Sequence, residues 1–417
     1  MESRETADAR RPLDWWRGAT PDAKRSLVAA ALGWGLDAFD VMLYALVLAS
    51  LMRDLGMPKT TGGLLGSLTL AAAAVGGVAF GVVADRYGRT RALIGSILIY
   101  SVFTGACGLA QTVWQLALFR VLLGFGMGGE WASGATLVSE TWPAEHRGKA
   151  LGFVQSAWAI GYGAAVVVAA LVMPIGGWRA VFFVGVLPAL FTAWVRRRVR
   201  EPAIWRSRQG VPAAARSRFA DIFRGEMLPL TVAVTLMNAC TMFAWWGFNL
   251  WIPSYLQLPV EEGGLGLGQY AMWLLIFMQV GMWFGYVTFG FVADSLGRKR
   301  TYVSYLIAAA VLVVLYTMTR NPWVLFALGP FVAFFGTGYF SGFGAVTAEI
   351  YPTEIRSSAQ GFTYNVGRIA SAVAPWTVGR LAETHGFAVA FPVIAAAFGL
   401  AALGWIWIPE TKGRELA

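Results

Sequence analysis

The chain has 417 residues, of which 57% are hydrophobic and only 13% are charged. A soluble domain of ordinary composition carries about 25% charged residues, so this chain lacks the polar surface that such a domain needs. Its two cysteines, Cys107 and Cys240, both fall in apolar runs and cannot build a disulfide framework. The composition excludes a soluble globular domain, a secreted disulfide scaffold and a disordered chain, and it indicates a membrane protein.

Apolar runs of about 20 residues, long enough to cross the hydrocarbon layer as helices, recur along the whole chain. We therefore predict an all-α membrane protein with twelve transmembrane helices. The predicted helices lie at residues 27–49, 60–84, 92–110, 113–138, 149–173, 178–195, 228–252, 269–293, 302–318, 323–347, 358–380 and 388–408.

The basic residues predict the orientation of these helices. An even number of crossings places both termini on one side, and the polar segments of that side hold 26 of the 33 Lys and Arg residues. Cytoplasmic loops of membrane proteins carry such an excess, so we predict that both termini are cytoplasmic and that the chain spans an inner (plasma) membrane. The net charge of +10 thus reflects topology, with anionic lipid and not nucleic acid as its partner. Residues 1–26 show no removable signal peptide.

An internal repeat divides the chain into two halves of six predicted helices. Eight residues of the first half recur 209 positions later: Gly81, Asp85, Gly88, Arg89, Glu140, Pro143, Arg147 and Glu201 match Gly290, Asp294, Gly297, Arg298, Glu349, Pro352, Arg356 and Glu410. Two copies with the same orientation form two bundles around an axis along the membrane normal. The predicted organisation is an N-terminal segment (1–26), a first bundle (27–195), a central loop (196–226), a second bundle (227–408) and a tail (409–417).

The repeated segments resemble a known family. Gly81-Val-Val-Ala-Asp85-Arg86-Tyr-Gly88-Arg89 is similar to the signature loop of the major facilitator superfamily, and residues 290–298 are its second copy. Asp37-Ala-Phe-Asp40 resembles the Asp-x-x-Asp pattern of bacterial organic-acid:proton symporters. Two further segments, Gly126-Met-Gly-Gly-Glu130-Trp and Ser139-Glu140-Thr-Trp142-Pro143, resemble the sialate and lactate:proton symporter group. The resemblance implies a secondary transporter of two six-helix bundles that works by alternating access.

The signature loops are predicted to control conformation. Their carboxylates and arginines can form charge-assisted hydrogen bonds at helix ends that exist only when the cytoplasmic side is closed. The alternative is that they form solvated turns that only fix the topology. The residues assigned to conformational gating are Gly81, Asp85, Arg86, Gly88, Arg89, Glu140, Arg147, Asp294, Gly297, Arg298, Glu349 and Arg356.

Charged residues in the middle of predicted helices are the candidates for coupling and binding. Each costs at least about 2.5 kcal/mol in the membrane and is usually functional. Asp37 and Asp40 are three residues apart and share one helical face, so one of them can hold a proton. The alternative is a static pair with Arg120. Glu130, towards the cytoplasmic half of its predicted helix, is a further candidate for proton relay, and a purely structural pairing is equally compatible with the sequence.

Arg368 is the candidate ligand for a substrate carboxylate. Its planar guanidinium can hold a carboxylate with two hydrogen bonds, and no acidic residue of the second half lies at a matching depth. The alternative is a salt bridge to the other half of the chain. Further candidates for substrate binding are Arg120, Asn365, Asn249, Tyr364, Asn238 and Gln155, with Trp245 and Trp246 as aromatic neighbours.

The sequence contains no nucleophile–base pair, no metal-ligand spacing around His146 or His385 and no nucleotide-binding motif, so we expect neither an enzyme nor a metal or other cofactor. We predict a monomeric transporter that imports a small organic anion, a monocarboxylate of the lactate or sialate type, together with a proton. The alternatives are a symporter of aromatic acids or sugars, a drug:proton antiporter, and a membrane sensor on a transporter fold.

Overall fold

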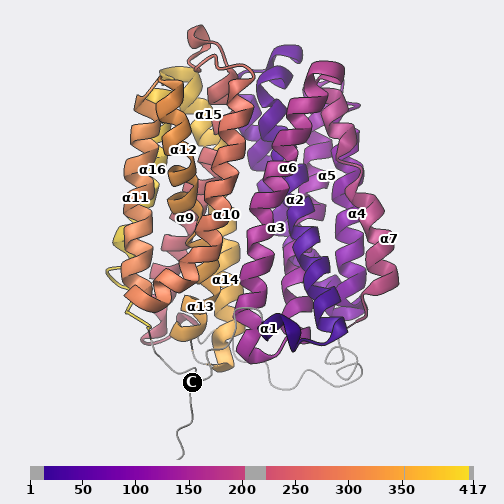
Figure 1. Cartoon of the computed structure of the whole chain (residues 1–417), viewed down its shortest axis with the longest axis vertical. Helices are drawn as coiled ribbons and strands as arrows, with labels where there is room; N and C mark the ends of the chain where they lie inside the picture. The colour runs from indigo at the N-terminus through magenta and orange to yellow at the C-terminus, as the bar shows by residue number, and fades with distance from the viewer. Residues whose placement is uncertain (1–13, 202–221, 352, 413–417) are drawn as a thin grey trace, which may run out of the picture.

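The computed structural model describes residues 14–201, 222–351 and 353–412. Two helical bundles stand side by side, and every regular element in these residues is helical. Figure 1 shows the first half of the chain, in indigo and magenta, on one side and the second half, in orange and yellow, on the other. Helix α1 and the last described residues lie at the same end of both bundles. We call this the terminal end, and the opposite end the distal end.

The first bundle begins after the short helix α1 (Asp14–Arg17) at the terminal end. Thr20 caps the next helix because its side chain accepts a hydrogen bond from the Ala23 N–H (3.2 Å). The helices of the bundle are α2 (Pro21–Asp54), α3 (Lys59–Tyr87), α4 (Arg89–Cys107), α5 (Val113–Thr141), α6 (Ala144–Val184) and α7 (Pro188–Arg198).

The second bundle repeats this order with more interruptions. Its elements are α9 (Met227–Gln257), the 3₁₀ turn η2 (Val260–Glu262), α10 (Tyr270–Leu296), α11 (Arg298–Met318), α12 (Pro322–Thr337), α13 (Phe340–Ile350), α14 (Thr353–Ser371), α15 (Ala374–His385) and α16 (Phe387–Gly404).

Nine helical segments of the described residues are long and apolar enough to cross a membrane. One of them, residues 149–195, contains two of the predicted crossings, because Gly177 in α6 has a non-helical backbone (φ 65°, ψ −171°). Helix α5 and the pair α14–α15 pack among these segments and complete the predicted set of twelve crossings. The all-α transmembrane fold expected from the sequence is confirmed.

Several predicted helices are longer or more interrupted than the sequence suggested. The predicted helix 323–347 is divided into α12 and α13, and the predicted helix 358–380 into α14 and α15. The second break, at residues 372–373, follows directly on the turn that carries Arg368. A break in a buried membrane helix leaves backbone groups without partners, which is tolerated next to a cavity or to other helices.

The two signature loops have the same backbone conformation. Gly88 ends α3 and begins α4 with φ 116°, and Gly297 does the same between α10 and α11 with φ 102°. Both dihedrals lie in a region that residues with a Cβ rarely adopt. A carboxylate also lies against each glycine. A Cβ on Gly88 would be 2.4 Å from Oε1 of Glu201, and a Cβ on Gly297 would be 2.6 Å from Oε2 of Glu410. Gly88 and Gly297 are therefore required by the turn itself.

We expect Gly297→Ala to lower the free energy of unfolding by about 1–3 kcal/mol, the usual cost of a strained backbone dihedral, with additional loss from the contact with Glu410. The matched control is Gly290→Ala, since a Cβ at Gly290 meets no atom within 4 Å. Thermal unfolding of the two variants in detergent checks this. Equal melting temperatures would contradict the assignment of strain to Gly297.

Candidate functional site: a cavity between the bundles

A cavity lies between the bundles, near the middle of the helices that line it. Its free volume is about 40 Å³, so it must widen to admit a ligand larger than a few waters. Its lining residues are Trp34, Met127, Gln155, Trp158, Met242, Trp245, Trp246, Tyr286, Phe340, Tyr364 and Arg368.

Aromatic rings form most of the cavity wall, and four of them are tryptophans. The rings of Trp34 and Trp158 lie 4.7 Å apart, and Trp158 meets Trp245 and Trp246 of the other bundle edge-on at 5.5 and 6.1 Å. The indole N–H groups of Trp34, Trp158 and Trp245 are buried without a hydrogen-bond partner. The sequence analysis did not single out Trp34 and Trp158. Their positions inside predicted helices, away from the interfaces that tryptophan prefers, could have identified them.

Arg368 brings a positive charge to this aromatic cavity. It lies on the last turn of α14 and is 5% exposed, and no carboxylate among the described residues lies within ion-pair distance of it. Its charge acts on Asp37 of α2 and on Glu130 of α5, which belong to the other bundle. The structure therefore brings three of the predicted mid-membrane charges together across the bundle interface.

Asp37 and Asp40 have different surroundings although they lie three residues apart. Both are 1% exposed, and their charges act on each other. Asp37 also interacts with Arg368, whereas Asp40 lies against Gly185 and α4, with its Oδ1 3.0 Å from the position of a Cβ on Gly185. The polar neighbour of Asp40 is the Thr104 hydroxyl of α4. The two carboxylates thus form neighbouring but distinct polar sites.

Glu130 is held in a space that small residues create. A Cβ on Gly33 would lie 2.6 Å from its Oε1, and one on Gly134 would lie 3.3 Å from the same atom. Glu130 is 1% exposed and neither of its carboxylate oxygens has a hydrogen-bond partner. A buried carboxylate without donors is more stable with a proton bound. The prediction that Glu130 relays a proton stays a prediction.

Arg120 is fully buried within the first bundle and does not line the cavity. Its guanidinium lies over the ring of Tyr44, 3.9 Å from the ring centre, which is a cation–π contact. Within the described part of the chain it has no ion pair with Asp37, Asp40 or Glu130, so the static pairs considered from the sequence are not formed here.

The other predicted ligands divide into two groups. Gln155 and Tyr364 line the cavity, and Oε1 of Gln155 lacks a donor. Asn249 instead donates to the Trp245 carbonyl (3.0 Å) and Asn365 to the Gly361 carbonyl (2.9 Å), each on its own helix. Asn238 donates to the Thr363 carbonyl of α14 at 3.0 Å. These three amides do not line the cavity in this state.

At the terminal end of the first bundle, charges join three helices. Arg89 of α4 holds Glu140 of α5 with two hydrogen bonds, of 2.9 and 3.2 Å. Glu201, which follows α7, accepts hydrogen bonds from the backbone N–H groups of residues 89, 90 and 91 (2.8–3.3 Å). A carboxylate at a helix N-terminus accepts hydrogen bonds from the backbone N–H groups that have no partner within the helix. Its negative charge also interacts favourably with the positive end of the helix dipole.

The second bundle repeats this arrangement. Arg298 contacts Asp294 and holds Glu349 (3.0 and 3.3 Å), while Glu410 of the tail accepts from the backbone N–H groups of Arg298 and Lys299. Burial alone would raise the pKa of Glu410, but four backbone N–H donors outweigh it and lower that pKa. Each set of bonds lies within one bundle, so these contacts tie helices of the same bundle together.

The remaining predicted gating residues make fewer contacts. Arg86 is exposed and lies over the ring of Tyr87 (5.5 Å), and a Cβ on Gly81 would meet open space. The side chains of Asp85, Arg147 and Arg356 lie outside the described residues.

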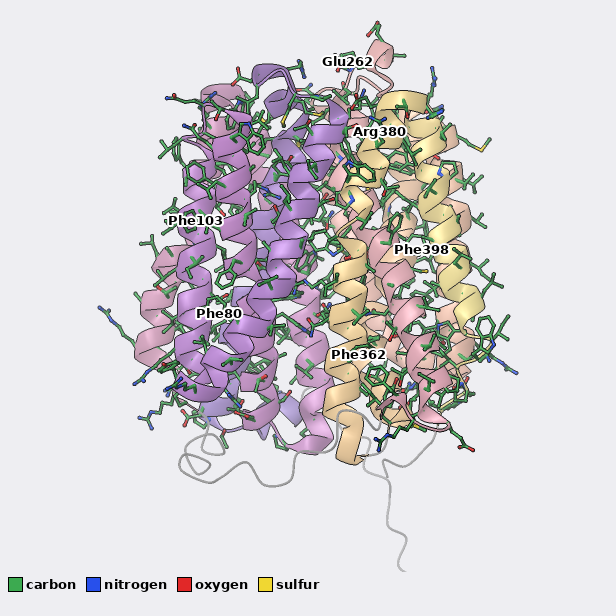
Figure 2. All side chains as sticks on the ribbon, turned by 180° about the vertical axis from the view of Figure 1, so that it is seen from behind. Phe80, Phe103, Glu262, Phe362, Arg380 and Phe398 are labelled. Carbon is green, nitrogen blue, oxygen red and sulfur yellow. The ribbon has the colours of Figure 1, made fainter. Side chains whose placement is uncertain are left out.

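The bundles are joined at the distal end. The N-terminus of α3 contacts α15 so closely that a Cβ on Gly63 would overlap the Pro375 carbonyl. Glu383 accepts a hydrogen bond from the Thr60 N–H (2.8 Å), and Oγ of Ser67 accepts one from the Trp376 N–H (3.1 Å). Lys59 donates to the Glu262 carbonyl (2.9 Å). Figure 2 shows Glu262 and Arg380 at this end of the second bundle. The cavity is therefore closed on the distal side.

Comparison with known proteins assigns the family. The model of the Major Facilitator Superfamily matches residues 30–269 and 261–417, which together span nearly the whole chain. The chain belongs to this superfamily. The assignment confirms the family predicted from the repeated loops, and it makes the protein a multi-pass membrane transporter and not an enzyme.

Several relatives of the chain are named as transporters of organic acids. The chain is 33% identical to the cis,cis-muconate transport protein of Acinetobacter baylyi, over 90% of this chain and 91% of the relative. It is 30% identical to the sialic acid transporter NanX of Escherichia coli, over 92% and 93%. The fold matches the partially occluded inward-open xylose transporter XylE of Escherichia coli, with a TM-score of 0.78 at 20% identity, over 95% of this chain and all of that one.

We expect Gly63→Ala to favour the state that is open at the distal end, because the added methyl group would overlap the Pro375 backbone only while that end is closed. Overpacking of this kind costs about 1–3 kcal/mol. Distances between spin labels at Arg53 and Arg380, both exposed at the distal end, should lengthen. Gly77→Ala on the same helix is the control, because a Cβ there would lie 3.4 Å from its nearest neighbour, the Gly128 carbonyl of the same bundle. An unchanged distance in Gly63→Ala would reject this contact as the distal gate.

Proposed function

We propose that the protein is a secondary active transporter that imports a small, flat organic acid together with a proton. It works as a monomer by alternating access, in an inner membrane with both termini in the cytoplasm. The observation that carries the proposal is Arg368, an arginine without an ion-pair partner among the described residues, in an aromatic cavity between two bundles.

The chemistry of Arg368 favours a carboxylate ligand. A guanidinium stays charged at every working pH, and burying it without a partner is unfavourable. A substrate carboxylate supplies the missing charge and accepts two parallel hydrogen bonds. A neutral sugar supplies no such charge, which favours organic acids over the sugar and drug alternatives.

The walls of the cavity favour a flat substrate. Aromatic rings make favourable contacts with planar π-systems, and the three free indole N–H groups are donors for carboxylate or other acceptor oxygens. A planar unsaturated acid, such as the muconate carried by one relative, presents both features. A bulky polyhydroxylated acid such as sialic acid fits this wall less well, and a monocarboxylate with a conjugated or aromatic body is the form that we propose.

The charges of the two bundles provide the coupling to protons. In this structure Arg368 acts on Asp37 and Glu130, which stabilises their negative charge. When a substrate anion binds Arg368, the carboxylates lose this stabilisation and become better proton acceptors. Binding of the anion therefore favours binding of the proton, and by thermodynamic linkage binding of the proton favours binding of the anion to the same extent. Asp40 and Arg120, deeper in the first bundle, provide a second polar site on the distal side.

The bonds at the terminal end serve the conformational change by keeping each bundle rigid. The Arg89–Glu140 and Arg298–Glu349 pairs tie helices within one bundle, so the bundles rock as units while the cavity opens to one side and then the other. In the present state the distal end is closed, so a bound substrate would leave through the terminal end once the bundles move apart there.

We expect Arg368→Lys to raise the KM for the substrate acid about 10- to 100-fold, because lysine keeps the charge but loses the second hydrogen bond. Internal pH of proteoliposomes is followed while lactate, benzoate, cis,cis-muconate, sialic acid or xylose is added. Arg380→Lys, at an exposed position of α15, is the control. Acid-driven proton uptake that is equal in both variants would remove Arg368 from the binding site.

We expect Asp37→Asn to abolish accumulation of the acid driven by a pH gradient while exchange of labelled for unlabelled acid persists. The amide cannot take up and release a proton, whereas the binding cavity and Arg368 remain. Asp22→Asn, exposed near the terminal end of the same helix, should behave like the parent protein. Gradient-driven accumulation by Asp37→Asn would assign coupling to another group.

A further inference from the structure

A buried amide lies next to the turn of α14 that carries Arg368. Asn238 of α9 is 2% exposed and donates from Nδ2 to the Thr363 carbonyl of α14 (3.0 Å). Both helices belong to the second bundle, and Thr363 precedes Arg368 by little more than one turn. Asn238 does not line the cavity, so it reaches the neighbouring helix and not the space where a ligand would bind.

Gly367 makes this contact possible. A Cβ at Gly367 would lie 2.5 Å from Nδ2 of Asn238 and 3.2 Å from the backbone nitrogen of Ala239. Atoms cannot approach this closely without displacement, so only glycine lets α9 and α14 meet at this point. The residue that this close packing fixes most directly is the next one, Arg368.

The turn is also fixed from its other side. Ser371 is fully buried and donates from Oγ to the Arg368 carbonyl at 2.7 Å. Helix α14 ends at Ser371, and α15 begins at Ala374. The last carbonyls of a helix have no partner within it, and a terminal turn without other support frays. Ser371 and Asn238 together hold a turn that would otherwise be mobile.

We propose that Asn238, through its contact with Gly367, is a positioning residue that sets the place of the Arg368 guanidinium and thereby the affinity for the substrate carboxylate. The inference rests on the proposed function of Arg368 and adds a residue that does not touch the substrate. Two parallel hydrogen bonds to a carboxylate require alignment within about 0.5 Å, so a small shift of this turn weakens recognition of the charge. It leaves contacts with the tryptophan walls unchanged.

The test compares binding of benzoate with binding of benzamide, which has the same ring but no charge. Quenching of intrinsic tryptophan fluorescence reports both in the purified full-length protein, because the cavity wall contains four tryptophans. The ratio of the two Kd values measures the contribution of the carboxylate. We expect Asn238→Ala and Gly367→Ala each to reduce this ratio about tenfold, the loss of roughly one charge-assisted hydrogen bond, with little change in the Kd of benzamide.

Matched controls exist on both helices. Thr235→Ala removes a half-buried side chain that bonds only within α9, and Gly361→Ala adds a methyl group to α14 where no atom lies within 4 Å. Both should keep the parent ratio. In the double variant Asn238→Ala/Gly367→Ala the 2.5 Å contact with Nδ2 is gone and only the 3.2 Å approach to the Ala239 nitrogen remains, so its ratio should lie close to that of Asn238→Ala and not fall by the product of the two single effects.

Two other outcomes are informative, because one would contradict the carboxylate site and the other would contradict the positioning role of Asn238. A parent protein that does not bind benzoate more tightly than benzamide would reject the proposed carboxylate site, and this inference with it. A parent protein that discriminates, together with variants that keep its ratio or that weaken both ligands equally, would reject positioning by Asn238 and leave the proposed function intact. If Asn238→Ala does not fold, the ratio of the two Kd values measured for Gly367→Ala tests the positioning role in its place.

Discussion

The burial of three charges where the bundles meet is the constraint on which the rest of the structure depends. Arg368, Asp37 and Glu130 are each at most 5% exposed, although burying charge in a membrane protein is unfavourable. The fold places them on facing helices of different bundles, near enough for their charges to interact but without a close ion pair among the described residues. In the function proposed here, an anionic ligand and a proton from outside the protein supply the charges that stabilise this arrangement.

The structure around these charges controls how they can move. Small residues let helices approach at the positions where a side chain must be held, as Gly33 does for Glu130 and Gly367 for Asn238. At the terminal end, arginine–glutamate pairs and the carboxylates of Glu201 and Glu410 tie the helices of each bundle together. The mobile interface is therefore the one between bundles, where tryptophan rings face each other across the cavity.

Much of this organisation could be predicted from sequence because it depends on composition and on repetition. Apolar length gives the crossings, and the offset of 209 residues identifies Gly88 and Gly297, whose matching dihedrals the structure confirms. Arg368 stands out because a charge in an apolar helix is rare. Sequence does not give the rotation of a helix about its axis, which packing decides. For this reason Asn238 and Asn249, expected at the cavity, contact helices instead, while Trp34 and Trp158 were overlooked.

The contact between Gly63 and Pro375 has a consequence for energy conservation. At this crossing backbone lies against backbone, with no flexible side chain between the helices, and hydrogen bonds from residues 59–67 flank it. Under the proposed function, such a backbone contact would keep a chain of water molecules, the path along which protons cross a membrane, out of the distal end. A proton gradient would then be protected by this contact while the distal end is closed, whether or not a carboxylate carries a proton.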